Sequence, residues 1–166
     1  MMHPSRARVL LAGMGLGASI FSFSLARAAT TTATFTVTAS VQTACAVSAN
    51  NLNFGAYAGQ QIDNTVTLLA TCSVTVPYDI GLNQGTFTGA TVTTRRMAGT
   101  DPAGLGYSLF QDTGRTTNWG NTVPTDTVHG VGTGFAQTVT VFGRIPGGQN
   151  VSPGSYSDTI TVTLNF

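Results

Sequence analysis

The sequence predicts an all-β fold, and three observations support that prediction. Apolar residues alternate with Thr, Ser or Asn over residues 32–41 and 159–166, which is the period of a strand with one buried face. Clusters of Gly, Pro, Asn and Asp separate short apolar runs, as turns between strands require. No twelve-residue window sustains a 3.6-residue period. Many short strands at this spacing indicate a sandwich or a closed sheet, and an immunoglobulin-like β-sandwich is the architecture that we favour.

Nine segments are expected to form strands. They are rich in the β-branched and aromatic residues that suit a pleated surface, and in chain order they are 33–41, 44–47, 51–54, 64–73, 78–83, 95–98, 106–111, 135–144 and 157–166. Turn-like clusters lie between them at 55–59, 83–85, 101–104, 112–114, 146–148 and 152–154. Residues 113–133 are expected to be rich in loops, with Trp119 as their only large anchor.

Residues 1–28 are expected to be a signal peptide. Arg6 and Arg8 form a basic start, residues 9–25 are apolar, and Ala26-Arg27-Ala28 fits a small-x-small cleavage site. The alternative is a membrane anchor, but the apolar run is rich in Gly and Ser and meets the cleavage site at once. The predicted organisation is therefore a signal peptide over 1–28, an N-terminal segment over 29–41 and one domain over 42–166. The roughly 138 mature residues suffice for a single core.

The charge of the mature chain excludes two classes of partner. It contains four arginines and six aspartates, with no lysine and no glutamate, so its formal charge is −2. Such a surface offers no basic footprint for nucleic acid and no basic face for an anionic membrane. Abundant Thr and Gly with few charges are typical of extracellular structural β-proteins. The same composition favours edge-to-edge strand pairing wherever an edge is open.

The two cysteines, Cys45 and Cys72, both follow the predicted signal peptide. In an oxidising compartment we expect one disulfide between them, which would stabilise the fold by about 3–4 kcal/mol. Two free thiols or a metal pair are the alternatives. A metal is disfavoured because the chain has no Cys-x-x-Cys spacing and no histidine near either cysteine.

Patterns that could support catalysis are weak. His129 is the only histidine in the predicted mature chain, and it lies in a Gly-flanked segment with Asp126 three residues away. We favour a surface or turn histidine over a member of a catalytic triad or a zinc ligand. The aspartates are dispersed, although two carboxylates could still meet in space, as a glycosidase requires. The Gly-rich run at 13–17 lies in the predicted signal peptide, and the run at 130–134 lacks the strand-to-helix context and the lysine of a phosphate loop. We therefore expect no enzyme, no catalytic residue, no metal and no cofactor.

Arg95, Arg96 and the aromatic residues have structural and binding interpretations. Of the two arginines, we expect one to point inward to pair with an Asp or cap backbone carbonyls and the other to be solvated, rather than both forming a binding patch. The aromatic residues are expected to fill the core rather than a sugar-binding face; they are Tyr57, Tyr78, Tyr107, Trp119 and Tyr156.

The alternating segment 33–41 precedes Cys45, so it lies outside the loop that a disulfide would close. It could be the first strand of a closed fold, paired within its own chain. It could equally leave its own domain and fill a groove in a neighbour, because strand addition gains affinity from main-chain hydrogen bonds and specificity from pockets for alternate side chains. The pattern alone leaves these alternatives open.

Motifs spread along the mature chain resemble those of the spore coat protein U domain family, which includes subunits of archaic, Csu-type chaperone–usher pili. The resemblance covers residues 35–166. It is carried by Cys45-Ala-Val with Leu52-Asn-Phe-Gly and Tyr57, by Cys72 with Val76-Pro-Tyr and Leu82-Asn-Gln-Gly, by Arg96-Met with Leu105-Gly-Tyr-Ser-Leu-Phe and Asn118-Trp-Gly, and by Val141-Phe-Gly-Arg-Ile-Pro with Gly154-Ser-Tyr-Ser-Asp-Thr. Each motif is short, but their order and spacing together are specific.

The resemblance implies an incomplete immunoglobulin-like sandwich that lacks its last strand and is completed by a donor strand. Residues 29–41 would be the donor segment, with Phe35, Val37, Ala39 and Val41 as its inserted side chains. The final strand would border the acceptor groove through Ile160, Val162, Leu164 and Phe166. The Cys45–Cys72 disulfide would staple the domain behind the donor segment.

The function implied is a structural pilus subunit for adhesion or biofilm formation, exported through the periplasm to the cell surface or secreted. Its implied partners are a periplasmic chaperone, an outer-membrane usher and other copies of itself or related subunits, with no nucleic acid and no small-molecule substrate. Two alternatives remain at this point. One is a secreted, non-polymerising coat protein whose first strand completes its own sandwich, and the other is a carbohydrate-binding module or tip adhesin.

Overall fold

The computed structural model describes residues 27–166, so the predicted signal peptide lies almost entirely outside the described residues. The chain divides into two units, residues 1–39 and 40–166. In the first, residues 27–39 have no regular secondary structure and their side chains are exposed. The second unit contains ten strands: β1 (Cys45–Ala49), β2 (Ile62–Cys72), β3 (Pro77–Leu82), β4 (Arg96–Gly99), β5 (Leu105–Gly106), β6 (Ser108–Phe110), β7 (Val128–Val131), β8 (Ala136–Ile145), β9 (Tyr156–Ser157) and β10 (Val162–Asn165).

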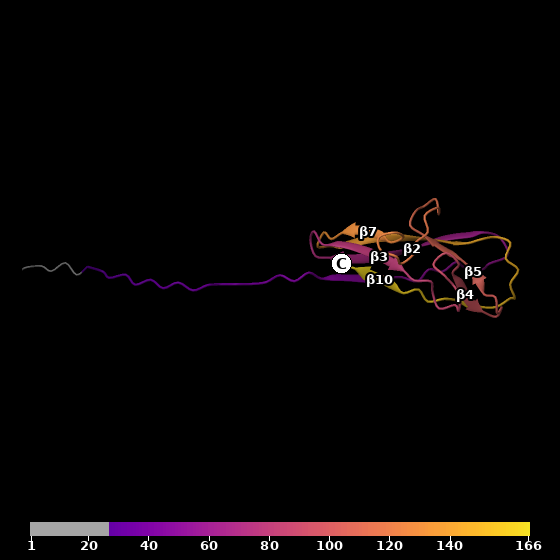
Figure 1. Cartoon of the computed structure of the whole chain (residues 1–166), viewed down its shortest axis with the longest axis horizontal. Coiled ribbons are helices and arrows are strands. Elements are labelled where there is room, and N and C mark those ends of the chain that lie inside the picture. The colour runs from indigo at the N-terminus through magenta and orange to yellow at the C-terminus, as the bar shows by residue number, and fades with distance from the viewer. Residues whose placement is uncertain (1–26) are drawn as a thin grey trace, which may run out of the picture. The chain divides into compact units, whose positions relative to one another are not determined.

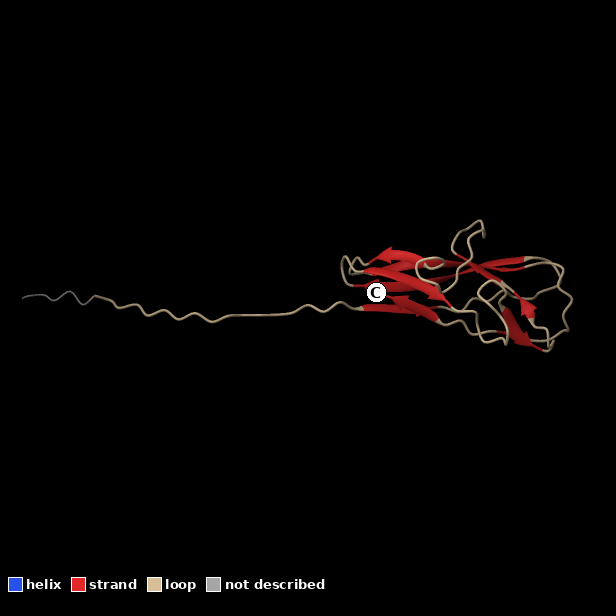
Figure 2. Ribbon diagram, in the orientation of Figure 1, coloured by secondary structure: helices blue, strands red, loops and turns tan. Residues whose placement is uncertain are grey.

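The all-β prediction and the immunoglobulin-like sandwich are confirmed. Figure 2 shows only strands and loops across the described residues, and among them no helix is long and apolar enough to cross a membrane. One sheet has the order β1-β2-β8-β6 and a second the order β10-β3-β7, while a small third sheet joins β5, β4 and β9. Every strand pair is antiparallel.

The core lies between the sheets because the long strands alternate. On β2, Leu68, Ala70 and Cys72 are buried whereas Leu69 and Thr71 between them are exposed, as a strand with one buried face requires. β3 contributes Ile80 and Leu82, and β8 contributes Val141 and Ile145. Trp119 is fully buried among them and donates its indole N–H to the carbonyl of Ile80 at 2.8 Å. The expected core role of Tyr78, Tyr107 and Trp119 is confirmed, and Tyr57 and Tyr156 pack half-buried against the same cluster.

Three expected strands differ in the structure. Residues 33–41 form no strand, since no ladder partner lies beside them. Residues 51–54 are a loop, in which the Asn53 side chain accepts the N–H of Gly55 at 2.9 Å and so closes a local turn. The expected strand 106–111 is divided at Tyr107, whose N–H donates to the carbonyl of Arg95 rather than to β8.

The end of the chain and the loop-rich segment also differ from expectation. The expected strand 157–166 is divided into β9 and β10. Between them, Asp158 accepts the N–H of Thr86 and Thr161 donates its N–H to the side chain of Asn83, and neither residue belongs to a strand. The segment 113–133 contains an unexpected strand, β7, which pairs with β3. His129 therefore lies on a strand rather than in a turn, with its side chain 61% exposed.

Candidate functional site at the open edge of the sandwich

Two strands at neighbouring edges of the sandwich are each paired on one side only. β1 hydrogen-bonds to β2 and β10 hydrogen-bonds to β3, yet β1 and β10 contact each other without forming a ladder. The registers place Cys45 opposite Cys72 and Asn165 opposite Asp79, so β1 starts at the end of the domain where β10 finishes. We call this end the disulfide pole; it is where the C-terminus lies in Figure 1. A strand between β1 and β10 would be parallel to one of them and antiparallel to the other.

A cavity of about 1120 Å³ opens at this edge, and residues of the hydrophobic core line it. Protein interiors ordinarily contain few voids larger than a water molecule, so a cavity of this size is a departure from ordinary core packing. Its walls are the segments 49–59 and 149–160, and its floor belongs to strands of every sheet. The apolar side chains that line it are Leu52, Phe54, Tyr57, Val66, Leu68, Leu82, Met97, Leu105, Tyr107, Leu109, Val141, Ile145, Val151, Tyr156, Ile160 and Val162. We call this cavity the core groove.

The four side chains expected on the final strand occupy different positions. Ile160 and Val162 line the core groove. Leu164 is half-buried and packs against the hydrophobic core beyond it. Phe166 is 63% exposed at the C-terminus. The expected donor side chains are also exposed: Phe35 by 88%, Val37 by 80% and Val41 by 95%, and Ala39 is exposed as well.

One wall of the core groove was missed by the sequence reasoning, which placed a strand at 51–54. Leu52 and Phe54 pack instead against β8 at Gly143, where an added Cβ would lie 2.7 Å from atoms of both side chains. Only glycine permits that approach. The Tyr57 hydroxyl accepts the N–H of Gln149 at 2.9 Å and donates to the carbonyl of Pro146 at 3.0 Å, which ties this wall to the other. The sequence feature that could have indicated this wall is the pair of apolar residues Leu52 and Phe54, which is followed directly by Gly55.

The other wall is held by Asp158. Its carboxylate accepts the N–H and the hydroxyl of Thr86, both at 2.8 Å, and the hydroxyl of Tyr107 at 2.7 Å. These bonds hold the chain between β9 and β10 outside any ladder and leave Ile160 facing the core groove. Burial, followed by the hydrogen bond to Asp158, raises the pKa of Tyr107, so its hydroxyl remains a donor at any physiological pH.

Arg95 links three segments of the chain through hydrogen bonds to their backbone carbonyls. Its side chain is only 1% exposed and donates to four backbone carbonyls, those of Leu82, Asn83, Val92 and Trp119, at 2.7–2.8 Å. Burial lowers its pKa to about 10, which leaves the guanidinium charged at neutral pH. Arg96 is exposed and donates to the carbonyl of Ala103. The prediction that one arginine of this pair would cap backbone carbonyls is confirmed.

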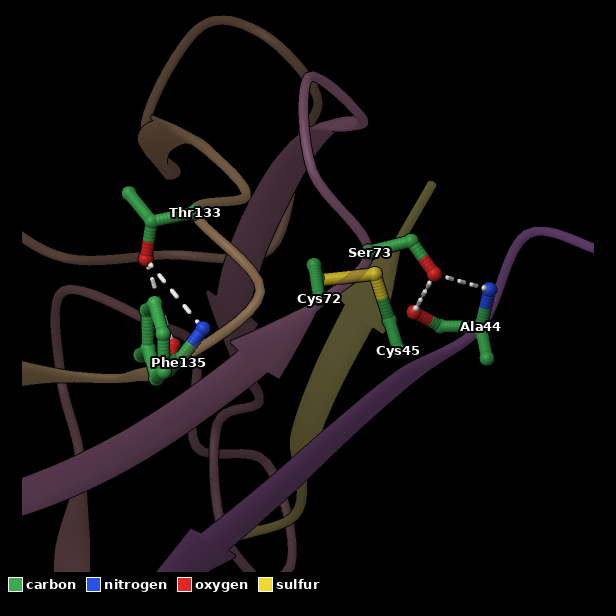
Figure 3. Close-up of a disulfide and its surroundings, with 6 residues drawn as sticks. All are labelled: Ala44, Cys45, Cys72, Ser73, Thr133 and Phe135. Carbon is green, nitrogen blue, oxygen red and sulfur yellow. Dashed lines mark hydrogen bonds between the residues drawn. A yellow bond between two sulfur atoms is a disulfide. The ribbon is translucent and has the colours of Figure 1, made fainter.

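The predicted disulfide is confirmed. Cys45 and Cys72 are directly opposite on β1 and β2, and they are joined at the disulfide pole. Beside the bond, Ser73 and Ala44 are linked by hydrogen bonds in both directions, as Figure 3 shows for the Ser73 hydroxyl. The point at which the chain enters β1 is therefore anchored both covalently and by hydrogen bonds.

Two further pairs of ionisable side chains lie outside the core groove. His129 Nδ1 lies 3.5 Å from Asp79, which also accepts the hydroxyl of Thr127 at 3.2 Å. Arg144 makes a two-pronged ion pair with Asp63 at 2.7 and 2.9 Å. Between residues 27 and 166, no group of three or more His, Cys, Asp or Glu side chains is arranged to hold a metal ion.

Comparisons with known proteins agree with this architecture. The family model described as the Spore Coat Protein U domain matches residues 31–163. Protein U of Myxococcus xanthus is 36% identical over 146 residues, covering 76% of this chain and 80% of that protein. The fold is also similar, with a TM-score of 0.58 and 24% identity, to a chain in the crystal structure of the CsuC–CsuE chaperone–tip adhesion subunit pre-assembly complex from the archaic chaperone–usher Csu pili of Acinetobacter baumannii. That match covers 76% of this chain but only 40% of the other.

Proposed function

Because the chain belongs to the Spore Coat Protein U domain family, we propose that it is a structural subunit of a chaperone–usher surface pilus that polymerises by donor-strand exchange. The observation that carries the proposal is the core groove, which is lined by core side chains and reaches β1 and β10, two strands that each have one unpaired edge. The same chain supplies an exposed segment, 29–41, whose alternate side chains are apolar. An unfilled groove and an unpaired strand of matching character favour assembly between copies.

The donor segment would insert every second side chain into the core groove. In that arrangement the inserted residues are Phe35, Val37, Ala39 and Val41, while the intervening Thr and Ser residues face solvent. Burying each of the larger side chains is worth about 1.5–3 kcal/mol. Ladder hydrogen bonds to β1 and β10 would add a net contribution of roughly 1 kcal/mol each. Such a junction would dissociate very slowly and would need no nucleotide to form.

The proposed partners follow from the exposed core. A periplasmic chaperone would cover the core groove before assembly, an outer-membrane usher would present the subunit, and other copies of this or related subunits would occupy the groove in the fibre. The predicted signal peptide supports export through the periplasm to the cell surface, where the fibre would serve in adhesion or biofilm formation. No part of this mechanism requires catalysis or a cofactor.

The test compares surface-shed material on SDS gels with and without boiling, using wild-type chain and a variant that lacks residues 29–41. A ladder in the unboiled wild-type lane that is absent from the deletion variant would support donor-strand polymerisation. Phe35→Asp should also abolish the ladder, because it places a charge in the core groove. The matched control is Thr36→Asp, which adds the same charge to the opposite face of the segment and should leave the ladder intact. Monomers in every wild-type lane would contradict the proposal and favour a self-completed coat protein.

A further inference from the structure

Three exposed apolar side chains gather at the disulfide pole. Val74 is 63% exposed, Val131 is 49% exposed and Phe135 is 78% exposed. They belong to two segments, 73–76 and 131–135, that backbone hydrogen bonds join: Thr75 N–H to Gly132 carbonyl at 2.8 Å, and Gly132 N–H to the carbonyl of Val76 at 2.7 Å. We call Val74, Val131 and Phe135 the apolar cap.

The apolar cap is held in place by its surroundings. The N–H of Gly134 donates to the carbonyl of Cys72 at 3.0 Å, so the loop before Phe135 is bonded to the backbone of a disulfide-linked residue. An added Cβ on Gly134 would lie 3.0 Å from Val74, which shows how closely the two segments approach. Figure 3 shows Thr133 and Phe135 hydrogen-bonded beside Cys72. Neither segment contains a charged residue. Single exposed apolar residues are ordinary, but an ordered, uncharged group that includes an exposed phenylalanine is typical of an interaction surface.

The length of the tether between donor segment and domain restricts what can cover the apolar cap. Only Gln42, Thr43 and Ala44 separate Val41 from Cys45, and Ala44 is already hydrogen-bonded to Ser73 at the disulfide pole. Three residues span about 10 Å when fully extended. A donor segment bound up to Val41 in another copy would therefore hold the disulfide pole within about 10 Å of that copy.

We propose that the apolar cap packs against a second copy of this chain, on the rim of the core groove that receives the donor segment. The inference rests on the proposed function. β10 runs toward the disulfide pole, so a donor strand antiparallel to β10 would leave the groove at the opposite end of the domain, beside the loops 55–59 and 150–155. Those loops line the core groove and contain no charged residue. The contact would join unlike ends of successive copies, as an open fibre requires.

A small contact suffices because the donor segment has already joined the two copies. Tethering converts the second contact into an intramolecular one with an effective concentration in the millimolar range for a short linker. The apolar cap then needs little area to be occupied, and its role would be to set the angle between successive subunits. An anionic membrane and nucleic acid are poor alternatives for a surface without basic residues.

The test replaces Phe135 with the photo-reactive analogue p-benzoylphenylalanine in the full chain, and irradiates assembled surface fibres. Boiled samples should then contain covalent dimers, and the cross-linked peptides should map to residues 55–59 or 150–155 of the second copy. The control places the same analogue at Leu69, which is 40% exposed in the middle of β2, and should give no dimers.

Unboiled samples of the same fibres separate the two proposals. An intact ladder without covalent dimers at position 135, or with cross-links to a different protein or to the disulfide pole of the second copy, would overturn this inference and leave donor-strand polymerisation standing. A missing ladder from unmodified chain would overturn both.

Discussion

Replacing Arg95 with methionine should strongly destabilise the domain, because its buried guanidinium holds backbone carbonyls from several segments. Four carbonyls accept hydrogen bonds from this one guanidinium at 2.7–2.8 Å. Hydrogen bonds to a charged group contribute roughly 1.5–3 kcal/mol each, which gives about 6–12 kcal/mol before the cost of burying the charge is subtracted. That desolvation cost is several kcal/mol. The expected net loss in the free energy of unfolding for Arg95→Met is therefore about 3–5 kcal/mol, consistent with the loss of one partner from a buried charged network.

The measurement is urea unfolding of the mature chain followed by the fluorescence of Trp119, the only tryptophan in the sequence. The probe is local, because the carbonyl of Trp119 is one of the four acceptors. Arg96→Met is the matched control: it removes the same charge from the next residue, which is exposed and makes a single hydrogen bond, so it should cost less than about 1 kcal/mol. Arg95→Lys should recover only part of the loss, since an ammonium has three donors and no planar fork. Equal stability losses for Arg95→Met and Arg96→Met would refute the reasoning.

Three further predictions concern acid, the disulfide and the polarity of assembly. Hydrogen bonding to Arg144 lowers the pKa of Asp63, so the folded chain binds that proton more weakly than the unfolded chain does. The resulting stability should be complete above about pH 4 and should be lost as the pH falls through the lowered pKa. Urea unfolding at a series of pH values should therefore show a shallower acid dependence of stability for Asp63→Asn than for the wild-type chain. Replacing Cys45 and Cys72 together with serine should cost about 3.5 kcal/mol for a loop closed over 27 residues; an unchanged urea midpoint would contradict that estimate. Val162→Asp should block the core groove while leaving the donor segment intact, and Phe35→Asp should do the reverse. Each variant alone should give monomers on a native gel, whereas a mixture of the two should give dimers. Longer ladders from the mixture would contradict the assigned roles.

The sequence predicted most of the sandwich because its long strands carry their own signal. The alternation is clear in the burial of β2 from Leu68 to Cys72 and of β8 from Val141 to Ile145. β7 was missed because its sequence, Val-His-Gly-Val, contains two residues that are poor strand signals and lies among glycines. Pairing with β3 decides its conformation, and that partner is about fifty residues away. Local propensity is overridden by such tertiary pairing.

The candidate site was predictable in its chemistry but not in its shape. The alternation at both ends of the chain predicted two strands with an apolar face. In the structure Ile160 and Val162 line the core groove, whereas residues 33–41 form no strand. It could not show that Asp158 would divide the final segment, because the partners of that carboxylate, Thr86 and Tyr107, are more than fifty residues away. Nor could it show that Leu52 and Phe54 would form a wall by packing on Gly143.

The position of the disulfide also determines how the domain carries mechanical load. A pull on the N-terminal segment reaches the domain at Cys45, the first residue of β1, which has only five residues and one ladder neighbour. Without a covalent bond, the tension would separate β1 from β2 before any other strand was loaded. The bond to Cys72 transfers the tension at once to β2, a strand paired on both sides and joined to β8 through ten residue pairs. The five-residue edge strand β1 is thereby bypassed, and the longest ladder among residues 27–166 bears the force.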